Sequence, residues 1–334
     1  MNHTIIIAEA GVNHNGSIQR AIDMIVAARD AGADYVKFQT GVPRLLISKF
    51  AQKADYQKKN TGTDESQLEM CEKITLGLDD YAKLKKKCDE VGINFMSTPF
   101  DLVSIDVLKN LNMDYMKIPS GEITNYPYLK KIAGLHMSAI MSTGMCNLSD
   151  IESAIKLLLD NGLTREMIIL LQCNTEYPTP YNDVNLNAMV TMGNCFGVKY
   201  GYSDHTKGIE VPIAAVALGA SVIEKHFTLD RTLPGPDHIA SLEPEELKQM
   251  VDSIRNVEMA LGSQMKCVSE SEKKNLSVAR KSIVATRDIS KGEFFTEENI
   301  TTKRPGNGIS PMLWNSVIGK TAKRDFKEDE LIEM

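Results

Sequence analysis

The sequence predicts a (β/α)8 barrel followed by a small C-terminal module. Short, continuously apolar runs, which are typical of parallel strands buried on both faces, alternate with amphipathic helical patterns. Eight such runs fit within roughly the first 260 residues, the usual size of this barrel. A change of pattern after Cys267 predicts the separate module. The expected strands are 4–10, 34–40, 93–98, 114–118, 138–143, 167–173, 196–202 and 221–227.

Helical patterns lie between most of the expected strands. Segment 18–32 has apolar residues at helical spacing and a glycine stop, and segment 78–92 opens with acidic residues and also ends at glycine. In segment 148–162 we expect Ser149 to be the N-cap. The remaining helical patterns are 209–220 and 243–262.

A doubly wound open sheet is the structural alternative to the barrel. That fold would be favoured by a G-x-G-x-x-G turn after the first strand, where a dinucleotide phosphate binds. Here the first strand continues into EAGVNHNG at residues 9–16 instead. The barrel is therefore preferred, and dinucleotide binding has little support.

Two stretches interrupt the alternation of strands and helices. Residues 41–74 form a long, basic and polar excursion, for which a lid over one face is a reasonable interpretation. After the barrel the chain becomes polar and then continues in short β-like runs. We expect a barrel domain at 1–266, a linker at 267–281 and a C-terminal domain at 282–334. Since about 55 residues make only a small core, we expect the last domain to lean on another surface, such as a partner subunit.

The composition indicates a soluble, cytoplasmic protein. A net charge of -6 argues against nucleic acid or an anionic membrane as the main partner. The six cysteines form no C-x-x-C pair and are typical of reduced core thiols. The first residues lack a basic region and a long apolar run, so we expect neither a signal peptide nor a membrane span.

Polar residues at the C-terminal ends of the strands are the first candidates for an active site, because barrels of this kind place it there. Lysines and hydroxyls beside the glycine turns at Gly121 and Gly144 suggest an anion pocket. His205 and His226, with carboxylates nearby, suggest an open divalent-metal site. Together they indicate a phosphorylated substrate and a metal-polarised carbonyl. The candidates are Glu9, Lys37, Gln39, Thr98, Lys117, Ser120, Glu122, Ser142, Thr143, Gln172, Cys173, Asn174, Ser203, Asp204, His205, Glu224 and His226.

Each of these side chains also has a structural explanation. A lysine at a strand end is commonly salt-bridged or extends its charge to solvent, and a histidine is commonly a hydrogen-bonded polar residue. Ser120 and Ser142 could cap the helices that follow them, and Cys173 fits a core position. Position at the strand ends alone therefore leaves the structural and functional interpretations equally open.

Ten short strings in a fixed order favour the functional interpretation. In this combination the chain resembles the sialic acid (N-acetylneuraminate) synthase family, over nearly all of its 334 residues. The resemblance implies a (β/α)8 TIM barrel with a small antifreeze-like (SAF-type) C-terminal domain. It also implies a domain-swapped homodimer, in which each small domain covers the partner's barrel. The strings are IIAEAGVNHNG (6–16), VKFQT (36–40), FMSTPF (95–100), KIPSGE (117–122), STGM (142–145), CNTEYPTP (173–180), YSDHT (202–206), EKHFTLD (224–230), PGPDH (234–238) and KRPGNGISP (303–311).

The activity implied by the resemblance is the condensation of phosphoenolpyruvate with N-acetylmannosamine and water, which gives N-acetylneuraminate and phosphate. A divalent metal is implied, Mn²⁺ first, with Mg²⁺ or Co²⁺ as alternatives. Legionaminate or pseudaminate synthases, which use diacetamido-trideoxy sugars, share these motifs and stay open as alternatives. Sugar-phosphate aldol synthases are more distant, and the C-terminal module argues against them. A non-catalytic sugar-binding protein is the alternative from another class, and the intact strings at 117–122 and 203–205 weigh against it.

The resemblance also implies roles for matching positions. His205 and His226 correspond to metal ligands, and Glu9 and Glu122 to carboxylates at the reacting centre. Arg304 is implied to reach across the dimer towards the N-acetyl group of the sugar. The positions implied around phosphoenolpyruvate are Lys37, Lys117, Ser120, Ser142, Asn174 and Ser203, and those around the acceptor sugar are Gln39, Tyr177, Asp237 and Arg304.

One departure from the family pattern affects this assignment. Some relatives carry CTNxYP or CTSxYP where this chain has CNTEYP at residues 173–178. The contact to the donor could come from the amide of Asn174, which we take as the expectation, or from the hydroxyl of Thr175.

Overall fold

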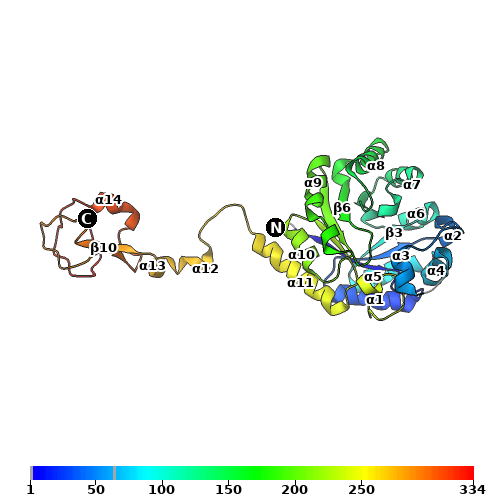
Figure 1. Ribbon diagram of the computed structural model, residues 1–334, viewed down its shortest axis with the longest axis horizontal. Helices are drawn as coiled ribbons and strands as arrows, with labels where there is room; N and C mark the ends of the chain where they lie inside the picture. Colours follow the sequence, from blue (N-terminus) through cyan, green and yellow to red (C-terminus); the bar gives the residue numbers. More distant parts are fainter. Residues whose placement is uncertain (1–2, 63–64) are drawn as a thin grey trace. The chain divides into compact units, whose positions relative to one another are not determined.

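The first part of the chain is a barrel of eight parallel strands, within the residues 3–62 and 65–334 that the computed structural model describes. Neighbouring strands in the order β3-β2-β1-β8-β7-β6-β5-β4 pair in parallel, and β3 also lies against β4, so the strands follow one another around a ring (Figure 1). The predicted (β/α)8 barrel is thereby confirmed. The strands are β1 (Ile5–Gly11), β2 (Tyr35–Thr40), β3 (Asn94–Pro99), β4 (Tyr115–Ile118), β5 (Ser138–Ser142), β6 (Ile168–Cys173), β7 (Lys199–Asp204) and β8 (Val222–His226).

Helices surround the strands and bury their apolar faces against them (Figure 1). No helix of the described residues is both long enough and apolar enough to cross a lipid bilayer. The helices that alternate with the strands are α1 (Ile18–Asp30), α5 (Asp80–Val91), α6 (Leu102–Lys109), α7 (Tyr126–Ala133), α8 (Leu148–Asp160), α9 (Leu186–Phe196), α10 (Glu210–Ala217) and α11 (Pro244–Leu261). Short 3-10 turns are η1 (Ser120–Glu122), η2 (Arg165–Met167), η3 (Tyr181–Asp183) and η4 (His238–Ala240).

Two local predictions were wrong. The seventh strand starts at Lys199 rather than at residue 196, because Phe196 is the last residue of α9 and Gly197, with a left-handed φ of 62°, ends that helix. The N-cap of α8 is Asn147 rather than Ser149. The Asn147 side chain accepts hydrogen bonds from the amides of Ser149 and Asp150, at 2.8 and 3.1 Å.

The register of β7 and β8 decides what the barrel presents on each face. Ser203 pairs with Glu224 and Asp204 with Lys225. Because side chains alternate along a strand, Asp204 and Lys225 point to the face opposite that of their neighbours. There they form a fully buried ion pair of 2.6 Å, and the Lys225 ammonium also donates to the carbonyl of Thr206.

The excursion that the sequence places at 41–74 is helical over much of its length. Its residues 63 and 64 lie outside the described residues. It leaves β2 at the C-terminal end and returns to α5, so it lies on the same side of the barrel as the strand ends. Its helices are α2 (Pro43–Leu46), α3 (Asp55–Thr61) and α4 (Gln67–Ile74).

The chain divides into two compact units, Met1–Gly262 and Ser263–Met334. The second unit has an antiparallel pair of strands and an apolar core of its own, which includes Ile283, Phe295 and Phe326. Residues 267–281, expected as a linker, contain two short helices. The elements of this unit are α12 (Glu270–Lys273), α13 (Leu276–Ala279), β9 (Ser282–Ala285), β10 (Ile300–Lys303), η5 (Pro311–Leu313) and α14 (Trp314–Val317).

Candidate active site

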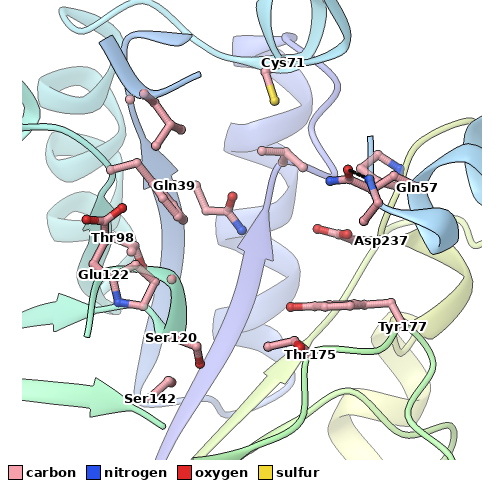
Figure 2. Close-up of a pocket in the computed structure, with 18 of the residues that line it drawn as sticks. Gln39, Gln57, Cys71, Thr98, Ser120, Glu122, Ser142, Thr175, Tyr177 and Asp237 are labelled. Carbon is pink, nitrogen blue, oxygen red and sulfur yellow. Dashed lines mark hydrogen bonds between the residues drawn. The ribbon is translucent and has the colours of Figure 1, made fainter. Parts of the chain in front are cut away.

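A cavity of about 590 Å³ lies at the C-terminal ends of the barrel strands, as the barrel fold predicts. This volume suits one or two small molecules. Of the residues to which the family resemblance gives a role, all except Asn174 and Arg304 line it. Of the other candidates at the strand ends, Thr98, Cys173 and Glu224 line the cavity, whereas Thr143, Gln172 and Asp204 do not. Figure 2 shows side chains from several strand ends and from the excursion converging on this space.

Two lysines and two carboxylates form a buried charge cluster at the bottom of the cavity. Lys37 lies 2.8 Å from an Oε of Glu9 and 3.6 Å from one of Glu224, and it donates to Thr98 Oγ1 at 3.0 Å. Lys117 lies 3.7 Å from the other oxygen of Glu224. Each of the four charged side chains is at most 4 % exposed. The two lysines and two glutamates balance in formal charge. Each ammonium group is paired with a carboxylate that an anionic ligand could replace.

The pKa values within this cluster diverge. Burial raises the pKa of Glu9 to about 7, against the opposing effect of Lys37. Burial would also raise the pKa of Glu224, but Lys117 and Lys37 outweigh it and lower that pKa. Burial lowers the pKa of Lys117, whereas Glu224 and Glu9 overcome burial at Lys37 and raise its pKa. Two carboxyl groups with separated pKa values are the arrangement that acid–base chemistry requires.

Hydroxyl groups surround the lysines. Lys117 donates to Ser142 Oγ at 2.6 Å, and Ser203 donates to Glu224 at 2.9 Å. Ser120 Oγ accepts the amide of Gly144 at 2.9 Å. A Cβ at Gly144 would come within 2.8 Å of that same Oγ, so this close approach requires glycine. Cations and hydroxyls concentrated in this way suit an anion that carries both phosphate and carboxylate.

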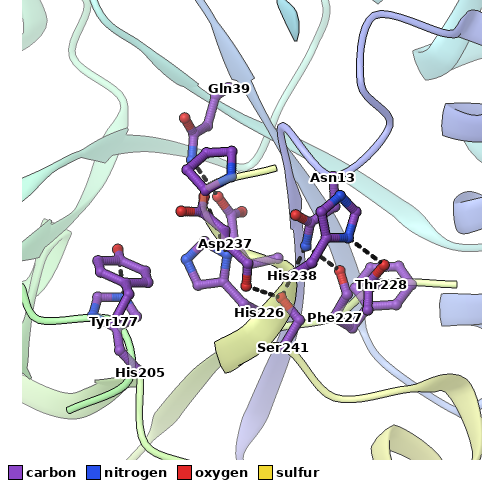
Figure 3. A network of polar contacts seen from close by, with 12 residues as sticks. Asn13, Gln39, Tyr177, His205, His226, Phe227, Thr228, Asp237, His238 and Ser241 are labelled. Carbon is purple, nitrogen blue, oxygen red and sulfur yellow. Dashed lines mark hydrogen bonds and ion pairs between the residues drawn. The ribbon is translucent and has the colours of Figure 1, made fainter. Parts of the chain in front are cut away.

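The two histidines of the strand ends lie together beside this charge cluster, since His226 of β8 pairs with Glu9 of β1. The ring centroids of His205 and His226 are 5.2 Å apart. Tyr177 stacks on His205 at 4.0 Å and meets His226 edge-on at 5.4 Å (Figure 3). Burial lowers the pKa of His205 to about 4 and that of His226 well below its usual range. Both rings are therefore neutral near pH 7.

Neutral imidazoles are the form that binds a divalent metal. The Asn174 carbonyl can only accept, so Nδ1 of His205 carries the proton and Nε2 accepts from the Tyr177 phenol at 2.9 Å. A histidine whose other nitrogen donates to a carbonyl is the usual metal-ligand arrangement. Among the described residues, Nδ1 of His226 is buried without a hydrogen-bond partner, 4.0 Å from Asp237. The two histidines with Asp237 thus fit a metal, although they do not form a preassembled cluster of three ligands in the described chain.

A hydrogen-bond network positions Asp237 beside the histidines. The Asn13 amide donates to the carbonyl of Phe227 and to Ser241 Oγ, both at 2.9 Å (Figure 3). Ser241 in turn donates to the carbonyl of Asp237 at 2.8 Å. The loop after β1 and the loop after β8 are thereby held together. Burial raises the pKa of Asp237 to about 7.

Two predicted residues lie elsewhere. Asn174 turns its side chain back on its own loop, where Oδ1 accepts from the amide of Glu176 at 2.8 Å, and Thr175 lines the cavity in its place. Arg304 belongs to the second unit, where its Nε donates to the carbonyl of Ala279 at 3.0 Å. Within the CNTEYP string it is therefore the side chain of Thr175, and not that of Asn174, that lines the cavity.

The structure gives a place in the site to Glu224, a strand-end candidate to which the family resemblance assigned no role, and to Tyr56, which was not a candidate. Glu224 lies at the centre of the charge cluster, and its spacing of two from His226 on one strand was the available signal. Tyr56, from the excursion, stacks on Tyr177 at 5.0 Å. Nothing in its local sequence pointed to that contact.

Known proteins resemble the chain over nearly its whole length. It is 54 % identical to an N,N'-diacetyllegionaminic acid synthase of Campylobacter jejuni, over 99 % of both chains. It is 47 % identical to an N,N'-diacetyllegionaminic acid synthase of Legionella pneumophila, over 94 % of this chain and 89 % of the relative. A crystal structure of an N-acetylneuraminic acid synthetase from Leptospira borgpetersenii, in complex with citrate, has a TM-score of 0.71 and is 34 % identical, covering 82 % of this chain and 90 % of that chain.

Family matches agree with these relatives. Residues 280–334 match the SAF domain, which confirms the antifreeze-like C-terminal domain. Residues 24–266 match the NeuB family. The chain therefore belongs to the NeuB family and is a phosphoenolpyruvate-dependent transferase that forms a carbon–carbon bond.

Proposed function

We propose that the protein is an N,N'-diacetyllegionaminate synthase. It condenses phosphoenolpyruvate with 2,4-diacetamido-2,4,6-trideoxymannose and water, and it releases phosphate. The acceptor is supported by identities of 54 % and 47 % to two legionaminic acid synthases. The first expectation, N-acetylmannosamine, is the second candidate, supported by the 34 % identity to the Leptospira enzyme.

The proposed reaction type rests on one observation, the pair of buried lysines beside two neutral imidazoles. Lys37 and Lys117 hold the phosphate and carboxylate of the donor, with Ser120, Ser142 and Ser203 as further hydrogen-bonding groups. When the donor binds, its negative charges replace those of Glu9 and Glu224 as partners of the two ammonium groups. Because both ammonium groups already line the cavity, a trianionic donor takes the place of these carboxylates rather than recruiting cations from elsewhere. We assign the donor contact expected of Asn174 to Thr175, because Thr175 lines the cavity.

His205 and His226 hold a divalent metal, with Mn²⁺, Mg²⁺ and Co²⁺ as candidates. When bound, the metal supplies Lewis acidity that polarises the aldehyde of the open-chain sugar. Tyr177, Gln39 and Asp237 line the space beside the imidazoles and orient the acceptor.

The reaction needs a base for the water that adds to the donor. The electrons of the C2–C3 double bond of phosphoenolpyruvate form the new bond from C3 to the sugar aldehyde carbon, and the aldehyde oxygen takes up a proton and becomes a hydroxyl group. Positive charge develops at C2, water adds there, and the C2–O bond to phosphate then breaks as the C2 carbonyl forms. Glu9 takes the proton of that water. Its pKa of about 7 suits a group that accepts and releases protons near neutral pH. Gln39 donates to Glu9 Oε1 at 3.1 Å and orients it. Glu122, whose pKa burial raises, is the second carboxyl group at the site.

We further propose that the enzyme is a cytoplasmic homodimer in which Arg304 reaches the acceptor of the partner subunit. The RPGNG turn supports this role, because it fits the family resemblance. Gel filtration with multi-angle light scattering tests the dimer, and Arg304→Ala tests the contact, through the KM for the acceptor.

Phosphate release tests the proposed function directly. The purified enzyme is treated with EDTA and reconstituted with Mn²⁺, and it is then given phosphoenolpyruvate with either sugar. Faster release with the diacetamido sugar is expected. Faster release with N-acetylmannosamine would replace legionaminate by N-acetylneuraminate, and no release with either sugar would refute both.

A further inference from the structure

The outer side of the cavity differs chemically from its charged base. It is formed by the 41–75 excursion, and its apolar surface, the outer wall, consists of Leu46, Ile47, Met70, Cys71 and Ile74. Figure 2 shows Cys71 and Gln57 of this segment facing the same space as Gln39 and Asp237. Gln57 and Gln67 add amide groups beside the apolar surface.

The excursion contains many charged side chains, but those that the structure describes all lie outside the cavity lining. Its described residues, 41–62 and 65–75, carry ten charged side chains, and none of these lines the cavity. Some pair with one another at the surface. Arg44 of α2, for example, donates to Glu72 of α4 at 2.7 Å and ties the two helices together. The cavity side of the excursion thus carries apolar side chains, the amides of Gln57 and Gln67 and the hydroxyls of Ser48, Tyr56 and Thr75, but no charge from the described residues, although its composition would allow a cationic pocket.

The excursion is also docked on the proposed acceptor site. Tyr56 stacks on Tyr177 at 5.0 Å, and Tyr177 in turn stacks on His205. The Asn60 amide donates to the carbonyl of Pro236 at 2.7 Å, next to Asp237. A sugar with its aldehyde at the histidines would therefore extend past Tyr177 towards the outer wall.

We propose that the outer wall selects an uncharged acceptor whose far end is a methyl group rather than a hydroxymethyl or phosphate group. This inference rests on the proposed function and names the part of the chain that sets its acceptor. The apolar side chains contact the C6 methyl, and Gln57 and Gln67 pair with an acetamido group. A C6 hydroxyl would lose hydration against these apolar side chains, and a C6 phosphate would find no cation among the described residues of the excursion that line the cavity.

Two neighbouring leucines of α2 provide a matched test. Leu46 lines the cavity, whereas Leu45 is 59 % exposed and does not. The same change is made at each, Leu46→Thr and Leu45→Thr, and kcat/KM is measured for 2,4-diacetamido-2,4,6-trideoxymannose and for N-acetylmannosamine. We expect Leu46→Thr to reduce the preference for the deoxy sugar by about 10-fold, the lower range for one misplaced group in an apolar pocket. Leu45→Thr should leave the preference unchanged.

A second variant of the outer wall keeps the inference testable if Leu46→Thr fails to fold. Cys71→Ser is nearly isosteric and should reduce the preference in the same direction by a smaller factor. If the wild-type enzyme prefers the deoxy sugar but Leu46→Thr and Cys71→Ser lower both kcat/KM values equally, the inference is overturned and the proposed function stands. A wild-type preference for N-acetylmannosamine would overturn the proposed function and this inference with it.

Discussion

Removal of the Asp204 carboxylate should destabilise the barrel strongly without touching the cavity. Asp204 and Lys225 are both fully buried, with the ion pair at 2.6 Å, and neither lines the cavity. In Asp204→Asn the Lys225 ammonium loses its anionic partner and keeps neutral acceptors such as the Thr206 carbonyl. Breaking one side of a buried ion pair costs about 3–5 kcal/mol, because the remaining charge stays desolvated.

The cost can be measured as a loss of unfolding free energy. For a barrel of this size each kcal/mol corresponds to about 2–4 °C, so the expected fall in Tm is about 6–20 °C. Circular dichroism at 222 nm reports mainly on the barrel, which contains the long helices. The only tryptophan, Trp314, lies in the second unit and would report on that unit instead.

A double variant separates the charge effect from packing. Lys225→Met combined with Asp204→Asn removes both charges and should recover most of the lost stability, since apolar replacements of buried pairs are often neutral or better. A loss below about 1 kcal/mol in the single variant, against the 3–5 expected, would refute the reasoning. So would a double variant no more stable than the single one.

Three further predictions concern the site and its surroundings. Lys117→Met should lower kcat/KM for phosphoenolpyruvate by about 100-fold or more, whereas Lys86→Met on the exposed face of α5 should match the wild type in the same phosphate-release assay. His205→Ala should abolish tight Mn²⁺ binding in calorimetry; unchanged affinity would remove this histidine from the ligand set. Burial lowers the pKa of His14 from 6.5 to about 4, so its neutral form contributes stability that is complete above pH 6.5 and is lost as pH falls towards 4. As the pH falls from 6.5 to 4, the free energy of unfolding of the wild type should therefore decrease relative to that of His14→Gln, by up to about 3 kcal/mol at 1.36 kcal/mol per pKa unit. Urea denaturation of both proteins at several pH values measures this difference, and a difference that stays constant would contradict the shift.

The barrel was predictable because parallel strands buried on both faces leave continuous apolar runs in the sequence. The same property explains the error at Phe196, since a short apolar run does not distinguish the end of a buried helix from the start of a strand. Only the backbone at Gly197 shows where α9 ends. Helices α6 and α7 span eight residues each, too few for a clear periodic pattern.

The rim residues were predictable as a group because position along a strand fixes the end at which a side chain lies. Which atom of a loop faces the cavity was not, because loop conformation depends on contacts that sequence spacing does not encode. Asn174 and Thr175 differ by one position, and hydrogen bonds within the loop decide between them. The excursion was expected as a lid, but its stacking through Tyr56 depends on tertiary packing alone.

The alternation along β7 and β8 makes these strands intolerant of changes in length. One inserted residue between Ser203 and His205 would exchange the two faces, carrying the imidazole into the packed layer and Asp204 into the cavity. The described residues of the excursion pair with no barrel strand, so the excursion can lengthen or shorten without moving one. Acceptor range can therefore diversify through insertions and deletions in the excursion while the residues that hold metal and donor keep their spacing. A combinatorial library for new acceptors would vary both length and sequence at 43–75 and leave the length of 199–226 fixed.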